Sequence, residues 1–533
     1  MTHDSLPVII AGGGPVGLIT ALGLVHYGVD VVVYEEDDQL SLDTKAGTVL
    51  TRTLEVLDRY GAIDEVLAAA LRIDEIGDLD RATGTARESV HTAELAGDTR
   101  YPFVINIPQH HLEPVLRDRL ERLAPGAVRM GHRVTGLTQH DDRVEVQVTT
   151  ADGVRTVSGA YLLACDGGRS QIRERLGITV EGHTLEQRYM LVDLDVDLDT
   201  ANPRDYPYLA YFGDPAEWMI LVRQPHCWRF LYPLDPGRPE PDRAELVAKA
   251  HRFIGDVDGL QVLGTNIYPV HHRVADRWRD GRIFLLGDAA HLITPMWALG
   301  LNTGVLDASN LPWRLAWVLR GWADETLLDG YEREQSPVAT RGSGEMAEAA
   351  RAYMDRRSSG VSAMDGGRWG VAVTRSLLGV SLDVDGTGDW SMIATGSAPT
   401  PAGPGDRLPD VPVFGPQGRQ WLHDLARDAF VALYFTDVRR RPQLPDAEVP
   451  GLRRYLVSRW DAPLDTGLRP RTLFDPGRRA TDRIGVPADS AVLVRPDGHI
   501  AAIVPFDPTD PTKDPIGDAY AHLTGAQSTG VER

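Results

Sequence analysis

A run of three glycines near the N-terminus constrains the fold of this chain more than any other feature. It stands in the segment LPVIIAGGGPVGLITALGLVHYGVDVVVYEED, between a short apolar run and apolar residues at helical spacing, and a valine-rich run follows and ends at Glu35. This order predicts a strand, a tight turn, a helix and a second, parallel strand. The expected fold class is therefore α/β, built on a Rossmann-like unit.

The spacing of these glycines also predicts a dinucleotide site. Gly12 allows the tight turn, Gly14 lets a pyrophosphate approach the N–H groups at the helix N-terminus, and Gly17 permits close helix–strand packing. Glu35 can bind a ribose hydroxyl and disfavours a ribose 2′-phosphate, because two negative groups would meet. The chain shows no second fingerprint of this kind, so we expect one permanently bound dinucleotide.

Later changes of pattern divide the rest of the chain. Longer alternating segments separated by prolines predict a second, mainly antiparallel sheet over about 185–270, with contributions from about 75–105. A linker rich in Gly, Ser, Thr and Pro, Thr395–Asp410, precedes a small α/β module. We expect a discontinuous dinucleotide-binding domain at 1–184 and 271–345, interrupted by a substrate-binding sheet domain at 185–270. A connecting helical segment at 346–394 and a C-terminal domain at 395–533 follow.

Composition excludes several classes of protein. The 55 Lys and Arg residues against 76 Asp and Glu give a net charge of −21, which would repel nucleic acid and anionic membranes. Cys165 and Cys227 are the only cysteines and form no Cys-x-x-Cys motif, so we expect neither disulfides nor a metal site. Neither a secretory signal nor a run of about 20 apolar residues is present, which predicts a cytoplasmic protein without nucleic-acid or membrane partners.

Two more strands end in turns that combine aspartate with glycine: Asp166-Gly167 in ACDGGRSQIRERLGI, and Gly287-Asp288 in GRIFLLGDAAH. With the glycine fingerprint, from Val8 to about Pro337, they resemble the three signatures of class A flavoprotein monooxygenases. These are FAD-dependent aromatic hydroxylases of the para-hydroxybenzoate hydroxylase fold. The resemblance is closest to the phenol hydroxylase and 3-(3-hydroxyphenyl)propionate hydroxylase branch and to related polyketide-tailoring oxygenases.

The C-terminal segment VLVRPDGHIA resembles the thioredoxin-like domain attached to that branch. It contains no cysteine, which excludes thiol redox chemistry in this domain. The implied architecture is a Rossmann-like FAD-binding domain with an inserted, mainly antiparallel substrate-binding sheet, plus a C-terminal thioredoxin-like α/β domain.

The resemblance also implies which positions bind FAD. Asp288 would bind the ribityl chain, while Asp166 and its neighbours would meet both FAD and the transient nicotinamide cofactor. Lys45 stands where the family usually has an arginine, and Glu36 where a basic residue is common, so contacts there should differ. The expected cofactor-binding positions are Gly12, Gly14, Pro15, Val16, Gly17, Glu35, Glu36, Lys45, Arg52, Gln109, Asp166, Gly167, Arg173, Gly287, Asp288, Pro295, Gly300, Leu301 and Asn302.

The implied activity is hydroxylation of a phenolic or polycyclic aromatic substrate. NADPH or NADH would reduce FAD, O2 would add to give a C4a-hydroperoxyflavin, and its distal oxygen would pass to the substrate. A Baeyer–Villiger outcome on the same fold and a non-catalytic flavin-binding protein stay open as alternatives. So do the nicotinamide preference, the substrate, the regiochemistry, any base, and the choice between monomer and homodimer.

One loop departs from the family pattern. In GDAAHLITPMWALGLNTG, bulky residues around Trp297 occupy the place where the family usually has Gly-Gly-Gln or similar. We predict that Trp297 lies against the flavin or the substrate entrance; the alternative is that it points into the domain interface. No catalytic residue is assigned, and the flavin-adjacent candidates are Pro295, Trp297 and His291, with a packing role favoured for His291.

The second sheet should supply the substrate pocket, although alternation alone does not say which face meets the flavin. The candidate wall residues are Tyr211, Met219, Leu221 and Trp297. In the helix after the loop, N–H groups near Leu301 and Asn302 would stabilise negative charge on the reduced flavin. Pro312 is expected to kink or break this helix.

Overall fold

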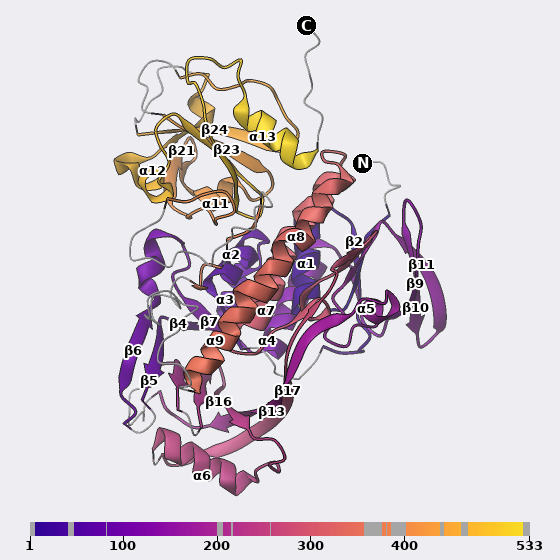
Figure 1. The fold of residues 1–533 in the computed structure, drawn as a ribbon, viewed down its shortest axis with the longest axis vertical. Helices are drawn as coiled ribbons and strands as arrows, with labels where there is room; N and C mark the ends of the chain where they lie inside the picture. Colours follow the sequence, from indigo (N-terminus) through magenta and orange to yellow (C-terminus); the bar gives the residue numbers. More distant parts are fainter. Residues whose placement is uncertain are drawn as a thin grey trace.

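The computed structural model of the chain describes residues 6–40, 47–80, 83–199, 206–214, 217–255, 257–355, 376–379, 381–384, 401–436, 442–459 and 467–525. These residues form a mixed α/β fold with several sheets, which confirms the expected class. Figure 1 shows the C-terminal sheet at one end of the molecule, a sheet with helix α6 at the other end, and the N-terminal unit between them.

A six-stranded sheet forms the N-terminal unit, in the order β18-β19-β12-β1-β2-β8. Its strands are parallel except for the edge pair β18–β19, and their apolar runs are almost fully buried. Their bounds are β1 Val8–Ala11, β2 Val31–Tyr34, β8 Val128–Arg129, β12 Tyr161–Ala164, β18 Arg279–Asp280 and β19 Ile283–Leu285. The C-terminal ends of β1, β12 and β19 meet at one edge, so the three turns singled out in the sequence leave the sheet side by side.

Helices and small sheets surround this unit. Between β8 and β12, the chain forms an antiparallel sheet of β9 (Arg133–Gln139), β10 (Val144–Thr150) and β11 (Gly153–Gly159), with the turn between β10 and β11 at Ala151-Asp152. The other elements are α1 Pro15–His26, α2 Thr51–Arg59, α3 Ile63–Ala69, α4 Gln109–Leu123, α5 Gln171–Arg175, and a sheet of β3 Thr48–Val49, β7 Val104–Asn106 and β4 Leu71–Ile73.

An eight-stranded sheet, in the order β20-β17-β13-β16-β15-β14-β5-β6, forms the second layer. Every pair is antiparallel except β14–β5. Helix α6 (Arg243–Ile254) covers one face, and the other face packs toward the N-terminal unit. The strand bounds are β5 Glu75–Leu79, β6 Ala86–His91, β13 Val180–Asp195, β14 Leu209–Phe212, β15 Met219–Gln224, β16 Cys227–Leu234, β17 Gln261–Ala275 and β20 His291–Leu292.

Long helices connect the layers (Figure 1). Helix α7 spans Leu299–Leu319, and α8 (Asp329–Pro337), a π-helical stretch (Val338–Gly344) and α9 (Glu345–Met354) follow one another as one rod. The expectation that Pro312 breaks the helix is wrong, because α7 runs through it. The carbonyl of Ala308, which a proline cannot satisfy, accepts a hydrogen bond from the Tyr60 hydroxyl at 3.1 Å instead.

The C-terminal part is a seven-stranded mixed sheet in the order β22-β21-β25-β24-β23-β26-β27. Its elements are β21 Pro412–Gly415, β22 Gly418–Trp421, α11 Leu422–Leu425, β23 Phe430–Phe435, β24 Leu452–Ser458, β25 Thr472–Phe474, α12 Arg479–Ile484, β26 Ser490–Val494, β27 Ile500–Pro505 and α13 Pro515–Thr524. The predicted linker lies partly outside the described residues. Every helix that the structure describes is too short or too polar to cross a bilayer.

Candidate functional site

The glycine turn after β1 forms an open cradle. A Cβ on Gly12, whose φ is +107°, would lie 2.2 Å from the carbonyl oxygen of Cys165, so only glycine fits. A Cβ on Gly17 would lie 2.1 Å from the oxygen of Gly12, whereas no described atom lies within 4 Å of one on Gly14. Helix α1 then begins at Pro15 with no acidic residue in its first turn. This end of the helix therefore presents free N–H groups to an anion.

Glu35 lies directly beside this turn. Its carboxylate accepts hydrogen bonds from Gly13 N at 2.6 Å and from Asp37 N at 3.0 Å. Glu36 is exposed and pairs with Arg133 at 3.0 Å, on the surface. Glu35 is therefore the carboxylate placed to meet a ribose, and the expected contact of Glu36 stays a prediction.

Asp166, at the end of β12, carries an orphaned oxygen. Its Oδ2 accepts a hydrogen bond from Ile172 N at 3.2 Å, while its buried Oδ1 has no partner in the described part of the chain. Burial raises the pKa of this carboxyl above its usual range. An unsatisfied buried acceptor costs about 1–3 kcal/mol, so the site favours a ligand that brings a hydroxyl or an N–H group.

Arg173 joins the second turn to the third. Its guanidinium donates to the carbonyls of Ala289 and Gly168, each at 3.0 Å, and is 7% exposed. Its side chain therefore fixes the two loops relative to each other. Its expected contact with a cofactor stays a prediction.

The Gly287-Asp288 turn is held from two sides. Gly287 has a φ of +57°, and a Cβ there would lie 3.1 Å from Val16 in the glycine turn. Its N–H donates to Asp307 Oδ2, on α7, at 2.8 Å. The next residue, Asp288, is exposed at the edge of the sheet. This arrangement directs the Asp288 backbone toward the edge that the other two turns share.

His291 packs inside the protein and does not face open space. Its Nε2 lies 2.8 Å from Asp307 Oδ2, both side chains are fully buried, and its ring stacks on Trp278. Asp307 therefore binds both the cofactor turn and this histidine. The sequence pattern did not lead us to predict a role for Asp307. An aspartate among apolar residues at helical spacing nevertheless indicates a buried, partnered carboxylate.

The loop before α7 contains two adjacent residues in the left-handed region, Trp297 at φ 56° and Ala298 at φ 58°. Each costs an L-residue about 1–2 kcal/mol, so neighbouring contacts must hold them there. Asn302 supplies one: its Nδ2 donates to Ala298 O at 2.6 Å, and its Oδ1 accepts from Leu50 N and Thr53 Oγ1. The Asn302 side chain is thus fully engaged, which leaves the backbone N–H groups of the first turn for a ligand.

Three other expected cofactor positions have different surroundings. The buried guanidinium of Arg52 donates to Glu55 at 3.0 Å and to the carbonyl of Asp497 at 2.6 Å. Gln109 begins α4 and donates to Glu113 at 2.7 Å. Lys45 lies outside the described residues. The FAD contacts expected of these three residues stay predictions.

The role expected of Met219 and Leu221 as walls of the substrate pocket stays a prediction, which their surroundings do not favour. Both face α6, where they pack in one cluster with residues such as Phe253. Their neighbours Trp218 and Ile220 lie on the opposite face, because side chains alternate along a strand.

The face of the eight-stranded sheet opposite α6 is rich in aromatic residues. Tyr211 lies on this face and belongs to the large apolar cluster that also contains Met296 and Trp297, and its expected contact with a substrate stays a prediction. Tyr189 and Trp218 pack edge to face there, with ring centroids 5.0 Å apart. Trp297 is 7% exposed and belongs to this cluster. An aromatic substrate bound between this face and the loop before α7 would therefore contact aromatic side chains.

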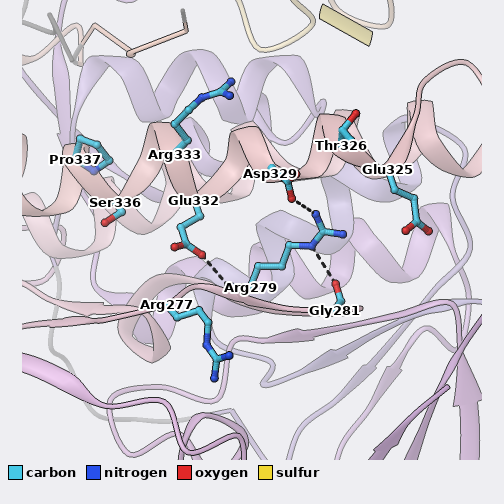
Figure 2. A pocket seen from close by; sticks show the side chains of 10 residues that line it. All are labelled: Arg277, Arg279, Gly281, Glu325, Thr326, Asp329, Glu332, Arg333, Ser336 and Pro337. Carbon is cyan, nitrogen blue, oxygen red and sulfur yellow. Dashed lines mark hydrogen bonds and ion pairs between the residues drawn. The ribbon is translucent and has the colours of Figure 1, made fainter. Parts of the chain in front are cut away.

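A groove of about 830 Å³ lies elsewhere, between β18 and α8 (Figure 2). Its charged groups are largely paired: Arg279 binds Asp329, and Glu332 accepts the N–H groups of Trp278 and Arg279. It adjoins Gly281, before β19, whereas the cofactor turn follows β19 at Gly287. We assign it no cofactor. Among the described residues, no cluster of three or more His, Cys, Asp or Glu side chains could hold a metal ion.

Comparisons with known proteins identify the family of the chain. The model of the FAD binding domain family matches residues 5–343. The chain is 30% identical to tetracenomycin B2 monooxygenase-dioxygenase of Streptomyces olivaceus, over 94% of this chain and 95% of the relative. It is 31% identical to para-nitrophenol 4-monooxygenase of Pseudomonas sp. (strain WBC-3), over 62% of this chain and 83% of the relative.

A solved structure resembles the chain over almost its whole length. It is the ternary complex of aklavinone-11 hydroxylase with FAD and aklavinone, with a TM-score of 0.79 and 27% identity, over 98% of this chain and all of that one. These matches confirm the resemblance predicted from the three turns. This chain belongs to the FAD binding domain family, among relatives that are FAD-dependent monooxygenases.

Proposed function

We propose that this chain uses FAD, NADPH or NADH, and O2 to hydroxylate a phenolic or polycyclic aromatic substrate. One observation carries the proposal: three polar turns converge at one edge of the parallel sheet, and the strand after the third turn, β20, pairs with β17 of the second sheet, one face of which carries buried aromatic residues. The named relatives support the substrate class, since they include enzymes named for para-nitrophenol and tetracenomycins.

The residues at the edge fit FAD. The glycine turn and the N-terminus of α1 would hold its pyrophosphate, and Glu35 would meet the adenosine ribose. Asp288 would bind the ribityl chain, and the orphaned Oδ1 of Asp166 would accept a hydrogen bond from a cofactor. The N-terminus of α7 would lie at the pyrimidine end of the ring.

When bound, FAD supplies the redox and oxygen chemistry, and the protein orients the reactants and excludes water. N–H groups at Gly300 and Leu301 would stabilise negative charge at the ring through the helix dipole. Met296, Trp297 and the aromatic face at Tyr211 would place the substrate ring and keep bulk solvent away. No protein nucleophile is needed.

The proposed organisation follows the same assignment. The FAD-binding domain comprises 1–184 and 271–345, and the substrate-binding sheet comprises 185–270 with strands β5 and β6. Both of these strands hydrogen-bond into the eight-stranded sheet. A connecting segment over 346–394 leads to a thioredoxin-like C-terminal domain over 395–533.

The test is a screen of the purified flavoprotein. Phenols and polycyclic aromatics are offered separately with NADH and with NADPH, and nicotinamide oxidation, oxygen uptake and peroxide release are measured together. We expect at least one compound to accelerate nicotinamide oxidation and to gain one oxygen atom as a hydroxyl group. Labelled O2 traces that atom.

Three outcomes would contradict the proposal. Consumed oxygen that appears entirely as peroxide for every compound would remove the support for hydroxylation. An ester or lactone with one inserted oxygen would instead show Baeyer–Villiger chemistry. A purified chain that binds no FAD would overturn the site itself.

A further inference from the structure

The C-terminal sheet contacts the FAD-binding part through buried charges. The turn between β26 and β27, residues 495–499, inserts between helices α2, α7 and α8. Arg495 and Asp497 in this turn are at most 1% exposed. A charged turn that inserts this deeply must have every charge paired, because an unpaired buried ion is strongly destabilising.

Each charge of the turn is paired with a residue of the FAD-binding part or of the turn itself. Arg495 donates to both carboxylate oxygens of Glu334, on α8, at 2.9 Å each. Asp497 accepts from Arg495 and, at 3.1 Å, from the Trp313 indole on α7. Arg314, on α7, binds the same Glu334 at 2.7 Å. Burial alone would raise the pKa of Glu334, but the two arginines lower it to about 2, so it is ionised.

Helix α2 is held from the C-terminal side at two points. Arg52 donates to the backbone carbonyl of Asp497 at 2.6 Å. Arg407 donates to Glu55 at 2.8 Å and to the carbonyl of Asp98 at 2.9 Å. Both guanidinium groups and the Glu55 carboxylate are at most 4% exposed. The position of α2 is therefore fixed by residues outside the FAD-binding part.

Helix α2 in turn fixes the start of α7. Leu50 N, before α2, and the Thr53 hydroxyl, in its first turn, both donate to Asn302 Oδ1, at 2.9 and 2.7 Å. The other end of that amide holds the carbonyl of Ala298, in the left-handed pair. Hydrogen bonds at both ends of this connection, joined through α2, thus link the 495–499 turn to the loop before α7.

We propose that the C-terminal domain is a working part of the FAD site, with Asp497 and Arg407 as positioning residues for α2 and the start of α7. The inference rests on the FAD site proposed above. It assigns Arg52 to this contact between the two parts of the chain. Without the turn, α2 would keep its fold but lose its fixed placement against Asn302, and FAD would bind a looser site.

The test compares two aspartates of the C-terminal domain that are equally buried, at 1% exposure each. Asp497→Asn removes a charge that binds the FAD-binding part. Asp475→Asn is the control, because Asp475 caps α12 within the C-terminal domain, accepting from Ala480 N and Thr481 N at 3.0 Å each. Both full-length apoproteins are titrated with FAD by flavin fluorescence, at a temperature where circular dichroism shows each to be folded.

We expect Asp497→Asn to raise the dissociation constant of FAD tenfold or more and to change the visible circular dichroism of the bound flavin. Asp475→Asn should lower the melting temperature and leave both readouts at their wild-type values. Equal FAD affinities for both variants would overturn the inference, since the domain would then contribute stability alone.

A second pair keeps the test decisive if Asp497→Asn does not fold. Arg407→Gln should weaken FAD binding in the same way, and Arg407→Lys should recover part of the affinity, because it retains the charge beside Glu55. Wild-type affinity in both Arg407 variants would refute the inference. A wild-type chain that binds no FAD would refute the proposed function, which distinguishes the two failures.

Discussion

The left-handed pair before α7 gives the sharpest stability prediction. In Ala298→Gly, the new residue adopts a φ of 58° without the roughly 1–2 kcal/mol that this region costs an L-residue. Glycine loses about 0.4–1 kcal/mol more backbone entropy on folding. The variant should therefore be more stable than the wild type by about 0.5–1 kcal/mol. A glycine in the interior of a helix has the opposite effect.

Trp297→Gly should act in the other direction. It relieves the same strain but removes an indole that is 7% exposed. About 200 Å² of buried surface, at about 25 cal/mol per Å², corresponds to about 5 kcal/mol. After the net gain of about 0.5–1 kcal/mol from relieved strain, the expected loss is about 4 kcal/mol. If Trp297 lies against the flavin or the substrate entrance, this variant should also change flavin reduction and substrate selectivity.

The assay is urea unfolding of the apoproteins, followed by far-ultraviolet circular dichroism. Ala316→Gly is the matched control, because Ala316 is a fully buried residue in the right-handed interior of the same helix. It should destabilise the protein by about 1 kcal/mol or more. An Ala298→Gly variant that loses as much stability as Ala316→Gly would refute the strain argument. Wild-type flavin reduction and selectivity in Trp297→Gly would favour a tryptophan directed into the domain interface.

Three further predictions follow from the site and the interface. Asp307→Asn should weaken FAD binding about tenfold or more by calorimetry, because the charge that holds the Gly287 turn is lost. Ile220→Ala should change substrate selectivity, whereas Leu221→Ala should lower stability by about 2–5 kcal/mol with selectivity unchanged; the opposite pattern in product assays would reverse our assignment of the two faces. Burial lowers the pKa of His499 to about 3, so the folded protein holds the neutral imidazole. The stability that this neutral side chain provides is present above pH 6.5 and is lost as the pH falls toward 3, because the unfolded chain binds the proton first. His499→Gln should therefore flatten the pH dependence of the unfolding free energy by about 1.4 kcal/mol per pH unit between pH 6 and 4, and an unchanged slope in denaturant titrations would contradict this.

The sequence predicted the parts of the site that depend on local backbone chemistry. Gly12 and Gly17 have no room for a side chain, and the turns at Asp166 and Gly287 end buried parallel strands, so short-range pattern was sufficient. Short-range pattern did not show which face of β15 meets the FAD-binding part. Alternation fixes that Met219 and Ile220 point in opposite directions, but only the position of α6 decides which direction meets the flavin.

Hydrogen bonds between residues far apart in the chain could not be predicted from the sequence either. Nothing near Arg52 shows that its guanidinium reaches a carbonyl 445 residues later, and nothing near Pro312 shows that the Tyr60 hydroxyl supplies a donor to the carbonyl that the proline leaves unpaired. Asp307 lies 20 residues after the glycine whose N–H it binds. In each case the partner comes from another element, and the contact exists only after those elements have packed.

At the three turns, side chains hold the loops in place and backbone groups face the sheet edge. This difference explains why so few side chains there can meet a cofactor. Side chains such as Arg173, Asp307 and Asn302 are engaged with neighbouring loops, while glycine turns and helix N-termini are left facing the sheet edge. In the proposed site, backbone groups held in this way would recognise the sugar and phosphate parts that every FAD molecule carries. Selectivity for the aromatic substrate would then depend on the sheet face at Tyr211 and Trp218 and on the strained loop at Trp297.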